Sequence, residues 1–136
     1  NVIVKKTKPA FEDERGIIFD LVDKENIRHI GMITSKKGSV RGNHYHITAK
    51  QITYVLSGQI ELVTKDMSNK DSKSEKIIME QGDITTIPPL VAHSIKALEE
   101  TTFLIFTDKQ RRDGGYEGDT HRVWFRLKCF LFTNRF

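Results

Sequence analysis

Residues 38–58 read GSVRGNHYHITAKQITYVLSG, and residues 82–93 read GDITTIPPLVAH. Both segments begin at a glycine, are rich in strand-forming residues, and together hold three histidines and a glutamine. Because side chains alternate between the two faces of a β-strand, His44 and His46 are expected to point to the same side. Two imidazoles on one face, with a third polar group reached after a turn, form either a set of metal ligands or a group of acid/base residues.

This array resembles the two signature motifs of the cupin superfamily, whose members are small β-barrels with a site in the barrel mouth. The residues at the family's fixed positions are Gly38, His44, His46, Gln51 and Gly58 in the first motif, and Gly82, Pro88 and His93 in the second. Leu90 and Ala97 replace the usual glycine and asparagine of the second motif. The resemblance covers residues 15–108 and implies an all-β, single-domain cupin β-barrel, or jelly roll.

The cupin resemblance also implies a set of ligands for one divalent ion, such as zinc, manganese, nickel or iron, and no organic cofactor. The candidate metal ligands are His44, His46, Gln51 and His93. Gln51 stands where a glutamate is usual, so its neutral oxygen removes one negative charge and weakens the hold on the ion. Some cupins that process sugars use paired histidines as bases without a metal. The sequence therefore leaves metal binding open.

Two shorter segments resemble one branch of the cupins. Residues 41–46 (RGNHYH) look like the R-G-x-H-x-H run of cupins that act on nucleotide-linked keto-sugars in cell-surface polysaccharide biosynthesis. Residues 116–122 (YEGDTHR) resemble the D-T-x-R ending of small epimerase-like chains. The resemblance implies a nucleotide-sugar epimerase or isomerase that acts on a 4-keto sugar by histidine-mediated proton abstraction. The alternatives are a metal-dependent cupin oxygenase and a non-catalytic cupin that binds a sugar or metabolite.

The keto-sugar reaction assigns roles to individual residues. Removing a proton from the carbon beside a ketone requires a base and a group that stabilises the enolate oxygen. His44 and His46 are the candidate catalytic residues, and Arg41 and Tyr54 the candidate substrate-binding residues beside the oxyanion. Arg41, together with an arginine from residues 111–122, is also suited to pairing a nucleotide diphosphate. Arg41 is equally well explained as an exposed charge on a strand.

The rest of the chain reads as short β-strands separated by turns. Ser57-Gly58 is predicted to be a two-residue hairpin turn, and residues 67–74 (MSNKDSKS) a surface hairpin loop. The predicted strands are 16–22, 27–34, 39–46, 51–56, 59–65, 76–80, 83–87, 91–97 and 102–108.

The two ends of the chain differ from the central barrel segment. Residues 1–122 are predicted to form the barrel domain with an N-terminal strand arm at residues 2–5. Cupins of this size often exchange N-terminal strands, so a homodimer is expected. Residues 123–136 form a basic and aromatic extension in which apolar residues alternate with Arg126 and Lys128. This alternation predicts an extra strand that covers a barrel edge, and a substrate lid is the alternative.

Length, composition and charge argue against a membrane or nucleic acid as a partner. The 136 residues suffice for one domain, and no segment approaches the length of about 20 apolar residues that spans a bilayer. The net charge of +4 comes from the last fifteen residues, so no broad basic face for nucleic acid is expected. We see no secretory signal at the N-terminus. The single cysteine, Cys129, fits a reducing compartment, and a cytoplasmic location is expected.

Overall fold

The computed structural model of the chain describes residues 2–123, which form twelve β-strands and no helix. The all-β prediction is therefore confirmed for this part of the chain. The strands are β1 (Val4–Lys6), β2 (Pro9–Asp13), β3 (Gly16–Phe19), β4 (His29–Ser35), β5 (Val40–Tyr45), β6 (Gln51–Ser57), β7 (Gln59–Asp66), β8 (Glu75–Glu80), β9 (Asp83–Ile87), β10 (Val91–Ala97), β11 (Thr101–Thr107) and β12 (His121–Arg122).

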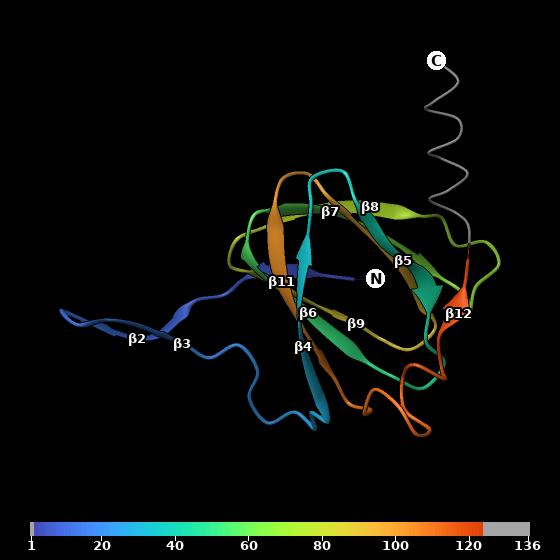
Figure 1. Cartoon of the computed structure of the whole chain (residues 1–136), viewed down its shortest axis with the longest axis horizontal. Coiled ribbons are helices and arrows are strands. Elements are labelled where there is room, and N and C mark those ends of the chain that lie inside the picture. The colour runs from blue at the N-terminus through green and yellow to red at the C-terminus, as the bar shows by residue number, and fades with distance from the viewer. Residues whose placement is uncertain (1, 124–136) are drawn as a thin grey trace, which may run out of the picture.

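Two five-stranded antiparallel sheets face each other and form the barrel (Figure 1). One sheet has the order β1-β9-β6-β11-β4, and the other has the order β12-β5-β10-β7-β8. Within residues 2–123, strands β2 and β3 pair only with each other, and they form a hairpin that projects away from the barrel. The chain thus crosses repeatedly between two sheets, as in a jelly roll.

The main core lies between the sheets and follows from strand alternation. In β7, Ile60 and Leu62 are fully buried, whereas Glu61 between them is turned outward and forms an ion pair with Lys76. Phe103 of β11 is also buried in this core. A second apolar cluster forms on the outer face of the first sheet, where Ile52, Tyr54 and Phe106 are covered in part by residues 21–27.

Several predicted boundaries differ from the structure. The predicted turn at Ser57-Gly58 is not a hairpin, because β6 and β7 belong to different sheets and do not pair. Gly58 has φ of +91°, and a side chain there would collide with the main chain of Glu100, so this corner requires glycine. β2 was not predicted, and β3 ends three residues earlier than expected. The predicted surface hairpin at residues 67–74 does join paired strands, β7 and β8.

The N-terminal arm pairs within its own chain. Val4–Lys6 lies antiparallel to β9, with Val4 opposite Thr85. The β2–β3 hairpin, and not β1, is the N-terminal element that extends beyond the barrel. The predicted strand in the C-terminal extension lies almost entirely outside the described residues.

Candidate functional site

A β-bulge between β5 and β10 aligns two of the three predicted histidines. His93 lies opposite His44, whereas Ser94 lies opposite Gly42, so Asn43 is the extra residue in β5. Gly42 and Asn43 both have positive φ, at +90° and +59°. A Cβ on Gly42 would lie 2.8 Å from the main-chain oxygen of His93. The R-G-x-H-x-H segment therefore needs this glycine for β5 to approach β10.

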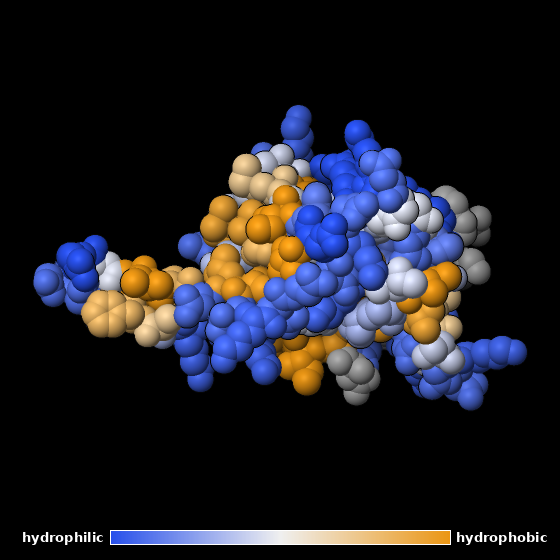
Figure 2. Space-filling view, turned by 90° about the horizontal axis from the view of Figure 1, so that it is seen from below, coloured by the Kyte–Doolittle hydropathy of each residue, from blue (hydrophilic) through white to orange (hydrophobic). Residues whose placement is uncertain are grey.

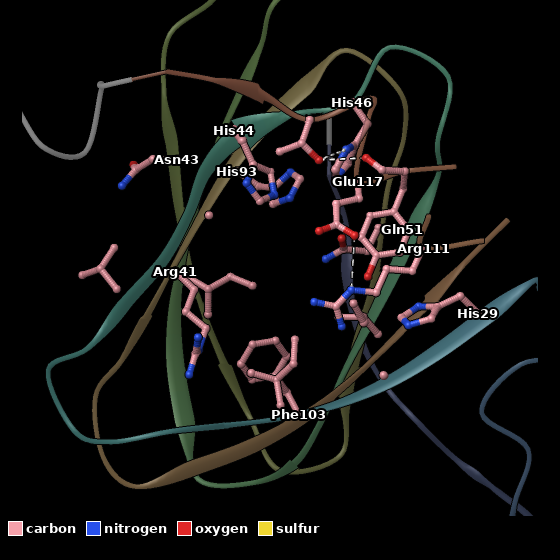
Figure 3. A pocket seen from close by; sticks show the side chains of 18 of the residues that line it. His29, Arg41, Asn43, His44, His46, Gln51, His93, Phe103, Arg111 and Glu117 are labelled. Carbon is pink, nitrogen blue, oxygen red and sulfur yellow. Dashed lines mark hydrogen bonds and ion pairs between the residues drawn. The ribbon is translucent and has the colours of Figure 1, made fainter. Parts of the chain in front are cut away.

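The three histidines lie together at one end of a cavity of about 770 Å³ (Figure 3). The ring centroids of His44 and His46 are 5.0 Å apart, those of His44 and His93 are 4.7 Å apart, and those of His46 and His93 are 5.5 Å apart. His46 and His93 are buried, and His44 is half-buried. Tyr45 does not line the cavity, and its ring packs against the ring of His121. Strand alternation predicted that Tyr45 would face away from His44 and His46.

Burial keeps the three imidazoles neutral at physiological pH. Burial, followed by the repulsion of the neighbouring His93 and His46, lowers the pKa of His44 to about 3. Burial lowers the pKa of His93 to about 4. Burial also lowers the pKa of His46, although its hydrogen bond to the Asp119 carbonyl acts in the opposite direction. Each ring therefore keeps one nitrogen lone pair available at neutral pH.

Main-chain carbonyls orient two of the rings. His46 Nδ1 lies 3.0 Å from the Asp119 oxygen, and His93 Nδ1 lies 3.2 Å from the Val91 oxygen. A carbonyl only accepts hydrogen bonds, so in each ring Nδ1 carries the proton and Nε2 carries the lone pair. His44 Nδ1 and His93 Nε2 are buried and have no hydrogen-bond partner among residues 2–123.

The donor set fits a divalent metal ion. One ligand atom from each histidine can be chosen so that all three lie within 4.8 Å of one another. Gln51 is buried, lines the same cavity, and donates from Nε2 to Thr53 Oγ1 at 3.2 Å. Its Oε1 remains available as a fourth, neutral donor. Two unpartnered buried nitrogens, with an amide oxygen on the wall of the same cavity, suit an ion that accepts imidazole ligands.

Arg41 lines the cavity, but part of its guanidinium is already engaged. Nε donates to Ser35 Oγ at 2.9 Å, and Nη2 donates to the Thr34 carbonyl at 2.9 Å. Figure 3 shows its side chain further along the wall, toward Phe103 and away from the three rings. Arg122 also lines the cavity, and its Nη1 donates to the Gly42 carbonyl at 2.9 Å. Both arginines are thus held by the cavity wall.

Tyr54 is not part of this cavity. Its side chain is buried in the cluster on the outer face of the sheet, against Ile52 and Phe106. Gln51 faces the cavity, and a residue three positions along the same strand must face the other way. The structure therefore does not bring Tyr54 to the histidines, and we do not retain it as a substrate-binding residue.

Residues 110–120 supply cavity side chains, and of these the sequence indicated only an arginine, not Tyr116 or Glu117. The Tyr116 ring lies 6.0 Å from the His46 ring and 5.1 Å from the His29 ring, measured between centroids. Arg111 and Glu117 form an ion pair at 3.6 Å, and both line the cavity (Figure 3). Burial raises the pKa of the Tyr116 phenol. This segment carries no local signal beyond its similarity to the D-T-x-R ending.

The family model described as the polysaccharide biosynthesis C-terminal domain matches residues 11–112. The chain belongs to this family. Among curated proteins, a vicilin-like seed storage protein of Arabidopsis thaliana is 27% identical over 107 residues, which is 71% of this chain and 15% of that protein. The chain thus spans a small fraction of that relative's length.

Solved structures of the same fold include enzymes that act on nucleotide sugars. The dTDP-4-dehydrorhamnose 3,5-epimerase of Sulfolobus tokodaii is 26% identical, with a TM-score of 0.68 over 82% of this chain and 72% of that one. The sugar 3,4-ketoisomerase QdtA of Thermoanaerobacterium thermosaccharolyticum, in complex with TDP, is 22% identical, with a TM-score of 0.73 over 91% and 89%. A 3,4-ketoisomerase from Helicobacter canadensis is 18% identical, with a TM-score of 0.75 over 93% of both chains.

These likenesses confirm the predicted cupin fold for the described residues. In addition, residues 2–123 contain no helix with the length and apolar character needed to cross a membrane.

Proposed function

We propose that this chain is a nucleotide-sugar epimerase or isomerase that acts on a 4-keto sugar in polysaccharide biosynthesis. The observation that carries the proposal is the group of three neutral histidines in a cavity that arginines also line. Such a site offers a base for a carbon acid and cations for an anionic substrate. The family match and the epimerase and ketoisomerases of the same fold support this assignment.

His46 is the best-placed base. Its Nδ1–H is held by the Asp119 carbonyl, which leaves the Nε2 lone pair free to take a proton from the carbon beside the ketone. The electron pair of the broken C–H bond moves to the ketone oxygen and gives an enolate. Return of a proton to the opposite face of that carbon inverts it. If the enolate oxygen is protonated, the neighbouring hydroxyl loses its proton and the former ketone carbon takes one up, the ketone moves to the neighbouring carbon. His44, at 5.0 Å between ring centroids, is placed to share these transfers.

The nucleotide part of the substrate carries two phosphates, which need cations. Arg41 and Arg122 line the cavity and retain N–H groups that make no hydrogen bond to the wall. Guanidinium groups pair with phosphate oxygens in a fixed, two-point geometry. We assign the diphosphate to these arginines, with Arg111 of the cavity lining as a third cation that Glu117 partly neutralises.

A divalent ion is compatible with the same residues. His44, His46 and His93 would hold it, with Gln51 as a weak fourth ligand. When bound, such an ion would supply a Lewis acid for the ketone oxygen. The fit of the donor set also makes a metal-dependent oxygenase the second candidate function. The neutral Gln51 weighs against it, because a carboxylate would hold iron more tightly.

We further propose that the chain forms a homodimer through the β2–β3 hairpin. Phe11, Ile17 and Ile18 of the hairpin are exposed, and Figure 2 shows hydrophobic side chains on the segment that projects from the barrel. β4 is an edge strand of its sheet among the described residues, and its outward Ile30 and Met32 are 63% and 69% exposed. The apolar hairpin of one copy can therefore pack against the apolar open edge of a second copy.

Deuterium exchange tests the enzymatic proposal. The protein is incubated with dTDP- and UDP-linked 4-keto-6-deoxy sugars in D2O, and deuterium at the carbons beside the ketone is followed by NMR. Exchange is expected with wild type, and His46→Asn should lower the rate by at least about a hundredfold. Oxygen uptake with ferrous iron and no exchange would favour the oxygenase. Saturable binding of a sugar with neither reaction would identify a non-catalytic binder.

A further inference from the structure

The segment Asp119–Arg122 runs beside β5, the strand that carries His44. It contributes more to the site than the guanidinium of Arg122. β12 pairs with β5, so that His121 lies opposite Tyr45 and Arg122 lies opposite His44. This pairing places Asp119 next to the turn that follows His46. The segment is thus fixed against the cavity wall at the point where the proposed base leaves its strand.

The Asp119 carboxylate caps that turn. Oδ1 accepts from the Ile47 amide at 2.9 Å, and Oδ2 accepts from the Thr48 amide at 2.8 Å, the Thr48 hydroxyl at 2.8 Å and the Ala49 amide at 3.1 Å. Burial raises the pKa of this carboxyl, but the hydrogen bonds from residues 47–49 outweigh it and hold the pKa well below its usual range. Four donors therefore fix one charged side chain.

The main chain of the same residue contacts the proposed base. The Asp119 carbonyl accepts from His46 Nδ1 at 3.0 Å, and Thr120 Oγ1 lies 3.5 Å from that nitrogen. The Thr120 hydroxyl donates to the Tyr116 carbonyl at 2.8 Å, which ties the segment to the loop above it. The side chain and the carbonyl of Asp119 thus hold two consecutive parts of the chain, residues 47–49 and His46.

We propose that Asp119 is a positioning residue that fixes the tautomer and the direction of the His46 ring. The carboxylate holds residue 119 against the turn, and the anchored carbonyl then keeps the proton on Nδ1 and the lone pair of Nε2 toward the substrate. This inference rests on the proposed function only for its effect on catalysis. The effect on the tautomer follows from the geometry alone.

The other cavity histidines lack this arrangement. The Nδ1 partner of His93 is Val91, two residues away on the same strand, so its orientation needs no other segment. His44 Nδ1 has no hydrogen-bond partner. Among the three histidines, His46 alone is oriented by a residue distant in sequence, and substitutions at that residue can change its tautomer without altering its strand.

Asp108 provides a matched control, because it caps the end of the same turn. Its Oδ1 accepts from the Lys50 amide at 2.9 Å, yet no hydrogen bond links Asp108 to a cavity histidine. Asp108→Ala and Asp119→Ala each remove a carboxylate from residues 47–50. Only Asp119→Ala releases the carbonyl that holds His46. Comparing the two separates loss of positioning from general loosening of the turn.

The tautomer is measured by long-range ¹H–¹⁵N NMR of the histidine rings, and catalysis by deuterium exchange kinetics. In wild type we expect the Nδ1–H form of His46 to dominate. Asp119→Ala should populate the Nε2–H form and lower kcat by at least about tenfold, with KM within about twofold. Asp108→Ala should leave both the tautomer and kcat within about twofold of wild type. If Asp119→Ala does not fold, Asp119→Asn, which keeps one acceptor oxygen, replaces it.

An unchanged His46 tautomer in a folded Asp119 variant would overturn the proposal. An equal loss of kcat in the Asp108 and Asp119 variants, at equal loss of Tm, would overturn it as well. The NMR comparison needs no substrate. If wild type shows no exchange with any keto-sugar, the proposed function fails, while the tautomer shift still decides whether Asp119 positions His46.

Discussion

His44 and His93 face each other across the β5–β10 pair, with ring centroids 4.7 Å apart and ring planes at 88°. This edge-to-face contact exists because the bulge inserts one extra residue, Asn43, into β5 between Gly42 and His44. A local backbone irregularity, and not strand alternation alone, thus sets the geometry of the site.

Gly42→Ala should destabilise the barrel and disrupt the histidine site. Its Cβ would meet the His93 oxygen at 2.8 Å, in addition to the strain of φ at +90°. Gly38→Ala is the control, because Gly38 has φ of +88° and no atom lies within 4 Å of a Cβ built there. We expect Gly38→Ala to cost about 1 kcal/mol and Gly42→Ala clearly more, measured by urea unfolding. Equal losses would show that φ strain, and not the close approach of β5 to β10, dominates.

Acid should destabilise the metal-free protein through the buried histidines. The pKa values of His44 and His93 lie at about 3 and about 4, below the value of about 6.5 in an unfolded chain. Between pH 6.5 and 4 the unfolded state binds more protons, so the free energy of unfolding falls as pH falls. Each such histidine contributes up to about 1.4 kcal/mol per pH unit.

Urea unfolding of chelator-treated protein at several pH values measures this slope. His93→Gln should give a shallower decline below pH 6.5 than wild type, because one titrating group is removed. The absolute stabilities can differ at pH 8, where the imidazoles are neutral in both states, so the slopes are compared. Parallel slopes for the two proteins would contradict a lowered pKa at His93.

Arg41→Met should weaken nucleotide binding more than it slows the chemical step. The guanidinium lies along the cavity wall away from the three rings, which suits the diphosphate better than the ketone. Loss of one charge-assisted pair predicts a KM about tenfold higher, with a smaller change in kcat. Arg112→Met is the control, because Arg112 is 76% exposed and does not line the cavity. A fall in kcat at unchanged KM would instead place Arg41 against the enolate.

Much of the fold and of the histidine site could be predicted from the sequence. The predicted strands from residue 27 to residue 108 correspond to β4–β11 within two residues, because alternating apolar residues and turn glycines are local signals. The histidines were predicted to converge because the motif spacing and strand alternation both placed them on one face. The pairing of β6 and β7 was wrong, because a local turn signal does not reveal that the chain changes sheet at Gly58.

The misplacement of Tyr54 was avoidable, whereas Tyr116 and Glu117 could not be assigned to the cavity from the sequence. Gln51 and Tyr54 are an odd number of positions apart on one strand, so alternation already places them on opposite faces. Tyr116 and Glu117 reach the cavity because β12 pairs with β5, a contact between segments about 75 residues apart in the chain. Nothing in their own sequence indicates that pairing. The hairpin strand Pro9–Asp13 begins at a proline and carries two acids, which obscured its strand character.

Gln51→Glu should strengthen metal binding at the histidine site. A carboxylate restores the negative charge that the amide lacks, in the same cavity as three imidazoles whose ligand atoms lie within 4.8 Å of one another. Elemental analysis of wild type purified without added metal should show less than one equivalent of metal, and the variant should retain more after chelator treatment. Gln59→Glu is the control for added charge away from this cavity. A full equivalent of iron that survives chelator in wild type would contradict the weak-site argument.

Phe11→Glu together with Ile18→Glu should convert the proposed dimer into a monomer. Both side chains are exposed on the hairpin, and a charge there opposes burial against the open β4 edge of a second copy. Ile78→Glu is the matched control, since Ile78 is similarly exposed on β8 of the other sheet. Light scattering after size exclusion should give twice the chain mass for wild type and for the control, and the single chain mass for the double variant. A wild-type monomer, or a double variant that remains dimeric and folded, would rule out the hairpin as the contact between subunits.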